Sequence, residues 1–287
     1  MKPQQASNTA KAIAASTILL ASDPRTAAQV APGAAALCRK FLSATWSDRL
    51  LAISAAQPLT RALWRWLERL TLPGIMAHYW RRKRWIESRC RNAIAQGFTR
   101  VIVLGAGFDT LGYRLAQEFS ELSVIEVDHP ATQNAKRRAF GGDPAAHSLR
   151  FVALDLNSEL LPASLLSDDR ATVVVMEGLL MYLSPVEIDR LFGVLRTLHA
   201  SRGRIIFSFM TRWPDGSTGF RPRSGLVERW LAWRNEPFTW GIEPSSAQGF
   251  LAAHRFSLVE LAPTRQFTDA PGVSALEGEN LVLCKPV

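Results

Sequence analysis

A glycine turn between a short apolar strand and a helix is the feature that most constrains how this chain can fold. Residues 101–104 (VIVL) predict a buried strand, residues 105–107 (GAG) the turn, and the following residues a helix. Because glycine has no Cβ, the backbone at such a turn can come close to a ligand. A Gly-x-Gly turn also occurs in ordinary loops, so by itself it is a weak signal.

The next predicted strand, residues 122–128, strengthens that signal because it ends in Asp128. An acid about 20 residues after the glycines lies at the carboxyl end of the adjacent parallel strand, where its carboxylate can accept hydrogen bonds from ribose hydroxyls. Together the two features predict a site for an adenosine-containing ligand. They do not distinguish a dinucleotide from S-adenosylmethionine.

From residue 97 onward, predicted strands and helices alternate as in a doubly wound α/β sheet. The predicted strands are residues 101–104, 122–128, 149–156, 171–177, 204–210, 256–261 and 280–285. The 171–177 run is almost wholly apolar, which is typical of a central parallel strand covered on both faces. The insertion 211–249 breaks the alternation and is rich in Trp, Arg, Pro and Gly. We interpret it as a lid-like segment on the ligand side of the sheet.

Residues 1–96 predict helices and no strand. Leu63, Trp66, Leu67 and Leu70 recur at helical spacing. The basic run 80–87, flanked by tryptophans, is expected to open another helix. Such a run could contact nucleic acid, but beside a nucleotide pocket it more simply offers cations to an anionic ligand. We therefore expect a helical cap region over residues 1–96 and a ligand-binding domain over residues 97–287.

Composition narrows the class of protein. The chain has 287 residues, a net charge of +9 and a pI near 10.1, so an acidic ligand, nucleic acid or an anionic surface must be considered beside simply solvated arginine. Three widely spaced cysteines argue for a reducing compartment and against a zinc site. No apolar run reaches the roughly 18–20 residues that span a membrane. A cytoplasmic protein without a membrane span is expected, and its oligomeric state is left open.

Four motifs, in order, are similar to those of the leucine carboxyl methyltransferase group of S-adenosylmethionine-dependent methyltransferases. They are LGAGFDT at 104–110, EVDHP at 126–130, DL at 155–156 and EGLLMYLS at 177–184, with weaker matches SNTA at 7–10, RKRWIE at 82–87 and EPFTWGI at 236–242. The resemblance implies a Rossmann-like class I methyltransferase fold, in which a seven-stranded sheet has its last strand antiparallel, plus the N-terminal helical cap. One departure is Leu111, where bacterial relatives usually carry arginine.

The resemblance also implies S-adenosyl-L-methionine as cofactor and assigns residues to it. The implied cofactor-binding residues are Lys11, Arg82, Gly105, Gly107, Asp128, Asp155, Leu156 and Glu177. Within this set Asp128 binds the ribose, Asp155 and Leu156 contact the adenine, and the glycines approach the amino acid end. Arg82 faces the cofactor carboxylate, with Arg84 as the alternative register.

Glu177 and Tyr182 are the implied catalytic positions. Glu177 lies against the cofactor's amino group or reacting centre, and Tyr182, with Met181, lines the acceptor site. Ordinary packing at a helix start is the alternative for Tyr182 and Met181. Glu126 shares the face of Asp128 on the predicted strand but lies further from its end, so we expect it behind the site.

The methyl acceptor is less well determined. A carboxylate, with a pKa near 4, is already ionised and needs no general base, whereas a hydroxyl more often needs one. Among the five histidines only His129 lies in a shared motif, and we expect it in a solvated loop. An acidic small molecule or peptide carboxylate is therefore favoured, and the hydroxyl of a small natural product is the alternative. The insertion could hold an acid through its arginines, which are Arg212, Arg221, Arg223, Arg229 and Arg234.

Other reactions are disfavoured. A nicotinamide-dependent oxidoreductase would want GxGxxG, but the third glycine is missing and Thr110 follows Phe108 and Asp109. Methylation of nucleic acid is disfavoured because there is no Asn/Asp-Pro-Pro-aromatic motif, so no nucleic-acid partner is expected.

Overall fold

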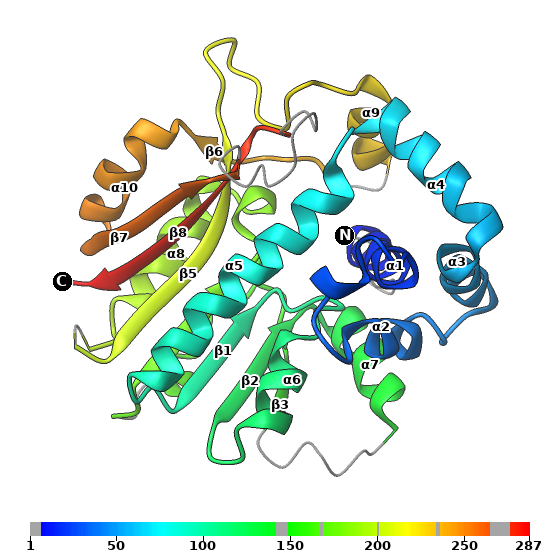
Figure 1. Ribbon diagram of the computed structural model, residues 1–287. Helices are drawn as coiled ribbons and strands as arrows, with labels where there is room; N and C mark the ends of the chain where they lie inside the picture. The colour runs from blue at the N-terminus through cyan, green and yellow to red at the C-terminus, as the bar shows by residue number, and fades with distance from the viewer. Residues whose placement is uncertain (1–6, 142–148, 167–168, 200, 234–235, 265–275) are drawn as a thin grey trace.

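The structure, a computed structural model, describes residues 7–141, 149–166, 169–199, 201–233, 236–264 and 276–287. One twisted sheet runs through the molecule with helices on both of its faces (Figure 1). Its strands are β1 (Arg100–Leu104), β2 (Ser123–Asp128), β3 (Leu149–Ala153), β4 (Thr172–Met176), β5 (Gly203–Thr211), β6 (Gly241–Ile242), β7 (Phe256–Pro263) and β8 (Glu279–Pro286).

The strand order is β3-β2-β1-β4-β5-β8-β7, and the two-residue β6 pairs with β5. β1 to β5 are parallel, whereas β8 is antiparallel to both β5 and β7. The expected class I fold with an antiparallel last strand is therefore confirmed, and all seven predicted strands occur. The extra strand, β6, comes from the 211–249 insertion, in a segment too short to carry a strand pattern.

Two apolar cores lie on the two sides of the sheet. α5 (Ile75–Ala95), α6 (Leu111–Glu118) and α7 (Pro130–Phe140) pack on one face, and α8 (Pro185–Leu195) and α10 (Ala247–Ala253) on the other. One face of α5 is buried, with Ile86 and Cys90 fully enclosed. The helix begins at Ile75, so the basic run lies in its middle and not at its start.

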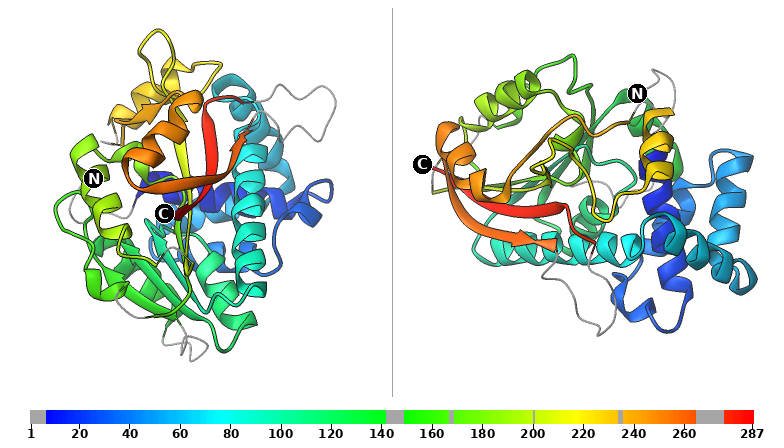
Figure 2. Two further views of the ribbon diagram at one scale, coloured as in Figure 1. Left: turned by 90° about the vertical axis from the view of Figure 1, so that its left-hand side faces the viewer. Right: turned by 90° about the horizontal axis from the view of Figure 1, so that it is seen from above.

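The remaining N-terminal helices gather at one end of the molecule, as the second view of Figure 2 shows. They are α1 (Asn8–Ser22), η1 (Ala27–Gln29), α2 (Ala34–Phe41), α3 (Trp46–Ala56) and α4 (Pro58–Thr71). α1 is central because it packs against α2, α3 and α5. The N-terminal helices are confirmed; the division at residues 96 and 97 stays a prediction, since α5 lies before it yet packs on the sheet.

The described part of the chain also contains the short 3-10 segments η3 (Ala163–Leu165), η4 (Leu180–Tyr182) and η5 (Pro244–Ser246), and the helix α9 (Gly225–Trp233). The insertion that carries α9 is tied back to the sheet at its end. The backbone N–H of Thr239 donates to the carbonyl of Met181 at 2.8 Å, and β6 pairs with β5. Because of these contacts the insertion lies against the segment that follows β4.

Candidate functional site

A cavity of about 660 Å³ opens at the carboxyl ends of β1, β2 and β4. β1 lies between β2 and β4, so the chain connections run in opposite directions from it, and ligands of open α/β sheets bind in the crevice at such a switch point. The volume is in the range of small-molecule and cofactor sites, roughly 300–1,000 Å³. The walls come from the loops after the strands, from α1 and α5, and from the insertion.

The glycine turn and Asp128 meet at the carboxyl end of β2. Gly105 and Gly107 have φ values of 68° and 48°, a conformation that favours glycine, and a Cβ on Gly105 would lie 3.0 Å from Leu179 Cδ1. The N–H of Gly107 donates to Asp128 Oδ2, and the N–H of His129 donates to Oδ1 at 2.6 Å. Burial raises the pKa of Asp128 despite these bonds. A carboxylate has about four acceptor positions, so two bonds leave capacity for two ribose hydroxyls.

His129 and Leu111 are two further motif positions, one at the cavity and one in the core. His129 is the N-cap of α7, its Nδ1 accepts from the N–H of Ala131 at 3.2 Å, and it lines the cavity. His129 therefore lies in the loop before the helix, as expected, but it is half-buried and its ring is held at the helix start. Leu111, the departure from the family pattern, is buried in the core beside α5 and leaves no cation at this point.

Asp155 and Leu156 follow β3 and line the cavity beside Asp128. Asp155 Oδ1 accepts from the N–H of Asn157 at 3.1 Å and from its side-chain amide at 2.9 Å. Although partial burial would raise the pKa of Asp155, these bonds lower it. The aspartate thus stabilises a turn and still presents a carboxylate to the cavity, next to an apolar side chain that could cover a flat ring.

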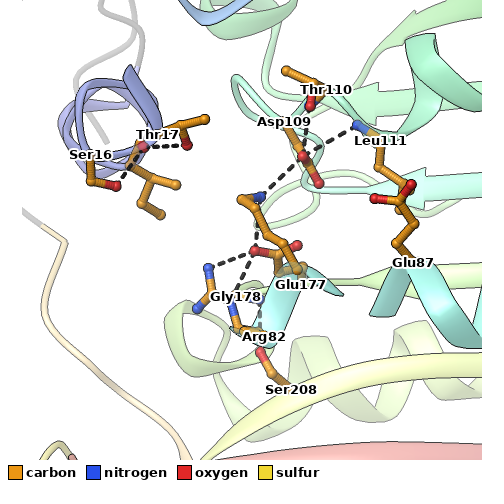
Figure 3. Close-up of polar contacts among 12 residues, drawn as sticks. Ser16, Thr17, Arg82, Glu87, Asp109, Thr110, Leu111, Glu177, Gly178 and Ser208 are labelled. Carbon is orange, nitrogen blue, oxygen red and sulfur yellow. Dashed lines mark hydrogen bonds and ion pairs between the residues drawn. The ribbon is translucent and has the colours of Figure 1, made fainter. Parts of the chain in front are cut away.

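Glu177 lies directly after β4, where a charged network surrounds it (Figure 3). Its Oε1 accepts from Arg82 Nε at 2.9 Å and lies 2.7 Å from Arg82 Nη2 and 3.0 Å from Lys83 Nζ. Lys83 also pairs with Asp109 at 3.0 Å. Glu177 Oε2 is buried and has no hydrogen-bond partner among the described residues. This oxygen is therefore available to accept a hydrogen bond from a bound ligand.

Arg82 connects this network to the last strand. Its Nη1 donates to both carboxylate oxygens of Glu279 at 2.9 Å, and Glu279 also lies 2.5 Å from His78 Nε2. Arg82 is buried and lines the cavity, whereas Arg84 is exposed and stacks over Trp80 at 5.2 Å. Of the two registers considered from the sequence, the structure brings Arg82 to the cavity.

Lys11 is the one implied cofactor residue that does not line the cavity. Its Nζ pairs with Asp48 at 2.9 Å, a contact that joins α1 to α3. Lys83, next to Arg82 in the RKRWIE match, also supplies a cation at the cavity wall, although no role was expected for it from the sequence. The signal that could have indicated it is its place inside that matched motif.

None of the four described insertion arginines lines the cavity. Arg221 pairs with Asp215, Arg223 pairs with Glu228 at 2.8 Å, and Arg229 Nε donates to the carbonyl of Gly225 at 3.3 Å. Arg212 is exposed, and Arg234 lies outside the described residues. The expected arginine clamp is therefore not formed by any of the four described arginines, because acids and carbonyls of the insertion itself hold three of them.

Aromatic and apolar side chains form a further part of the cavity wall. They are Leu72, Tyr79, Met181, Tyr182, Phe220, Val227 and Phe238. The Tyr182 and Phe238 ring centroids lie 5.8 Å apart, and those of Phe220 and Phe238 lie 6.1 Å apart. Burial raises the pKa of Tyr182 and raises that of Tyr79 to about 12, so both phenols stay protonated at neutral pH. Tyr182 and Met181 thus line the cavity, and their contact with a methyl acceptor stays a prediction.

Acids outnumber cations on the described cavity wall. The acids are Asp109, Asp128, Asp155, Glu177, Glu236 and Glu279, against Arg82 and Lys83 as residues with a fixed positive charge. A surplus of negative charge favours a ligand that carries positive charge.

Within the described residues no group of three potential ligand side chains is placed to hold a metal ion. No helix of the described part of the chain combines the length and apolarity needed to cross a bilayer.

Comparisons with known proteins agree with this geometry. The family model described as "Leucine carboxyl methyltransferase" matches residues 24–196. A protein of Mycolicibacterium smegmatis named "Putative S-adenosyl-L-methionine-dependent methyltransferase" is 32% identical over 188 residues, which are 60% of this chain and 59% of that protein. A protein of the same name from Mycolicibacterium paratuberculosis is 32% identical over 191 residues, which are 62% of this chain and 60% of that protein. The matches thus span about three fifths of these relatives' lengths.

Among solved structures, the crystal structure of a "putative methyltransferase" from Thermobifida fusca YX superimposes with a TM-score of 0.57. The match covers 87% of this chain and 93% of that chain at 18% identity, so it bears on the fold alone. The family match covers more than half of the chain and includes the glycine turn, Asp128, Asp155 and Glu177. The chain belongs to the leucine carboxyl methyltransferase family.

Proposed function

We propose that the protein is an S-adenosylmethionine-dependent methyltransferase that transfers the methyl group to an oxygen atom of a small molecule or peptide. The observation that carries the proposal is the buried Glu177 Oε2, which has no partner among the described residues and lies in a network with Arg82 and Lys83. A carboxylate oxygen beside two cations suits the amino acid end of the cofactor. The cofactor's ammonium can donate to Glu177, while the cofactor's carboxylate faces Lys83 or Arg82.

The other lining residues fit the rest of the cofactor. Asp128 would accept from the two ribose hydroxyls, Asp155 from the exocyclic amine of adenine, and Leu156 would cover the ring. Gly105 and Gly107 leave room for the amino acid end to approach the turn. The acid-rich wall would stabilise a sulfonium, which is the one fixed positive charge that distinguishes S-adenosylmethionine from S-adenosylhomocysteine.

The protein's part in the reaction is positioning. When bound, the cofactor supplies a methyl group that its sulfonium already activates. The chain's own residues then have to hold the acceptor oxygen in line with the methyl carbon and exclude water. Tyr182 and Phe238 lie on the apolar wall where an acceptor would pack. Tyr182 and Glu177 are therefore the proposed catalytic positions, one beside the acceptor and one beside the cofactor.

A carboxylate is the first candidate acceptor, because it is ionised without a general base and agrees with the family to which the chain belongs. An acidic small molecule or peptide, a cytoplasmic location and the absence of a nucleic-acid partner remain part of this proposal. The hydroxyl of a small natural product is the second candidate. It is favoured by the aromatic wall, and by the pairing of both Arg82 and Lys83 with carboxylates.

Two experiments test the proposal in turn. Calorimetric titration with S-adenosylhomocysteine and with NAD should show binding of the first only; binding of NAD alone would overturn the cofactor assignment. Candidate acids and phenols are then incubated with methyl-labelled S-adenosylmethionine, and the product is exposed to mild alkali. A methyl ester releases its label as methanol. A product that keeps its label would exclude carboxyl methylation and point to the hydroxyl acceptor.

A further inference from the structure

An apolar face on α3 and α4 points away from the core. It comprises Trp46, Leu50, Ile53, Leu59, Leu63, Trp66, Leu67 and Leu70, and we call it the α3–α4 face. These are eight of the fourteen exposed large hydrophobic side chains among the described residues, so the exposure is concentrated at this one place. Exposed apolar side chains gathered on neighbouring helices mark an interaction site more often than side chains that are exposed singly.

The spacing of these residues shows that the face is built into the two helices. Residues 46, 50 and 53, and residues 59, 63, 66, 67 and 70, each form one stripe along a helix. The opposite sides of the same helices face inward, with Ala52 and Ala55 of α3 in the core and Arg61 and Arg65 of α4 directed to Asp23. No residue of α4 is buried, and Leu59 is 92% exposed. The sequence pattern correctly predicted the helix, but its apolar side does not face the protein.

Charge indicates what covers this face. Residues 34–71 contain six cations, which are Arg39, Lys40, Arg49, Arg61, Arg65 and Arg69, and only two acids. Of the two acids, Asp48 is buried and paired with Lys11, and Glu68 is partly buried. Arg39, Lys40, Arg49 and Arg69 are exposed. Two of these exposed cations, Arg49 and Arg69, lie on the two helices of the face itself, and no acid in this stretch is fully exposed.

Tryptophan and leucine on one side and arginine around them are the pattern of a helix that lies in the interface of an anionic membrane. A second copy of this chain would bring two positively charged faces together, which like charges oppose. The face also ends at the cavity, because Leu72, which directly follows α4, is part of the cavity wall. We propose that the α3–α4 face binds the surface of an anionic lipid bilayer. Its apolar side chains would lie among the headgroups, and the rest of the protein would stay on the same side of the bilayer.

The test is flotation of the full chain with vesicles of phosphatidylcholine and phosphatidylglycerol, and with vesicles of phosphatidylcholine alone. The wild type should float with the anionic vesicles, and raised salt should weaken binding because part of the attraction is between charges. The triple variant Leu63→Ser/Trp66→Ser/Leu70→Ser should lower the partition coefficient at least about tenfold, since apolar side chains contribute most of the interfacial binding. These side chains are exposed, so the fold should persist and circular dichroism checks it.

A matched control is Leu160→Ser/Val186→Ser/Val259→Ser, three side chains that are similarly exposed but lie elsewhere. It should float like the wild type. Three results would overturn the proposal. The wild type could bind neither vesicle type, it could bind both types equally, or the α3–α4 variant could bind the anionic vesicles as strongly as the wild type does. Sedimentation showing a wild-type dimer that the α3–α4 variant dissociates, with no vesicle binding, would also overturn it, because the face would then join two copies. Vesicle binding is read without any methyl acceptor, so the outcome is independent of the proposed reaction.

Discussion

Thr9 and Glu236 are 227 residues apart in the sequence and are joined by two hydrogen bonds in the structure. The N–H of Thr9 donates to Glu236 Oε2 at 3.2 Å, and its hydroxyl donates to the same oxygen. Glu236 Oε1 accepts from the N–H of Asn8, also at 3.2 Å. The carboxylate therefore satisfies free amides in the first turn of α1, where the helix dipole favours negative charge.

This contact closes the helical cap over the cavity. Ala10 and Ile13 of α1 line the cavity, and Glu236 does so from the insertion. We expect Glu236→Ala to loosen α1 and to weaken binding of S-adenosylhomocysteine by about tenfold, because it removes charge-assisted bonds worth about 1.5–3 kcal/mol each. Calorimetry measures the dissociation constant. Glu243→Ala, at a nearby exposed position, is the control; equal dissociation constants for the two variants would show that Glu236 does not hold the cap.

The two acids of β2 should respond differently to substitution. Asp128 lines the cavity, whereas Glu126 is fully buried and pairs with Lys136 at 2.7 Å. Asp128→Ala should lower the affinity for S-adenosylmethionine at least roughly tenfold, because the bonds to the ribose are lost. Glu126→Gln should instead lower the free energy of unfolding by about 3–5 kcal/mol, since it leaves a buried ammonium without its counter-charge.

Titration calorimetry and denaturant unfolding together separate these effects. An unchanged dissociation constant for Asp128→Ala, with its fold intact by circular dichroism, would remove Asp128 from the ribose. A Glu126→Gln variant that is as stable as the wild type would show that the buried pair contributes nothing to stability.

Local patterns in the sequence predicted the sheet and the residues at its carboxyl edge. The strands around Asp128 and Glu177 were evident because apolar runs end in an acid, and helix starts such as Ser184–Pro185 follow local capping rules. The contact between Thr9 and Glu236 could not be predicted, because it joins two weak motifs through the tertiary fold. Composition could suggest arginines for the insertion, but only the structure shows that Arg221 and Arg223 pair with neighbouring acids.

Arg82 and Arg84 offer a second comparison. Arg82→Ala should weaken binding of both S-adenosylmethionine and S-adenosylhomocysteine, because both carry the same carboxylate. It should also destabilise the fold, since Glu279 and Glu177 lose their shared partner. Arg84→Ala, at an exposed site, should change stability by less than about 0.5 kcal/mol and leave binding unchanged.

Lys83→Gln keeps the test interpretable if Arg82→Ala does not fold. Lys83 is 24% exposed in its side chain and pairs with Asp109 and Glu177, so its loss should disturb the fold less while still weakening both ligands. Affinities that stay at the wild-type value in Lys83→Gln and fall in Arg84→Ala would show that the cations were assigned in the wrong register.

The last prediction concerns the stability of the protein in acid. Burial alone would raise the pKa of Glu279, but the Arg82 guanidinium and the bond to His78 outweigh it and lower the pKa from 4.5 to about 2. A carboxylate with a lowered pKa in the folded state stabilises the fold above its unfolded pKa, and that stability is lost as the pH falls toward the folded value. The contribution of Glu279 should thus be complete above pH about 4.5 and decline between about 4.5 and 2.

Glu279→Gln removes this contribution at every pH. At neutral pH we expect the variant to be less stable than the wild type by about 3 kcal/mol, the free energy that corresponds to the size of the shift. The difference should shrink as the pH is lowered below about 4.5, because the wild type then loses the same interaction. Denaturant unfolding at a series of pH values measures it, with Glu121→Gln, at an exposed acid, as the control. A difference that stays constant down to pH about 3 would show that the charge of Glu279 does not stabilise the buried network.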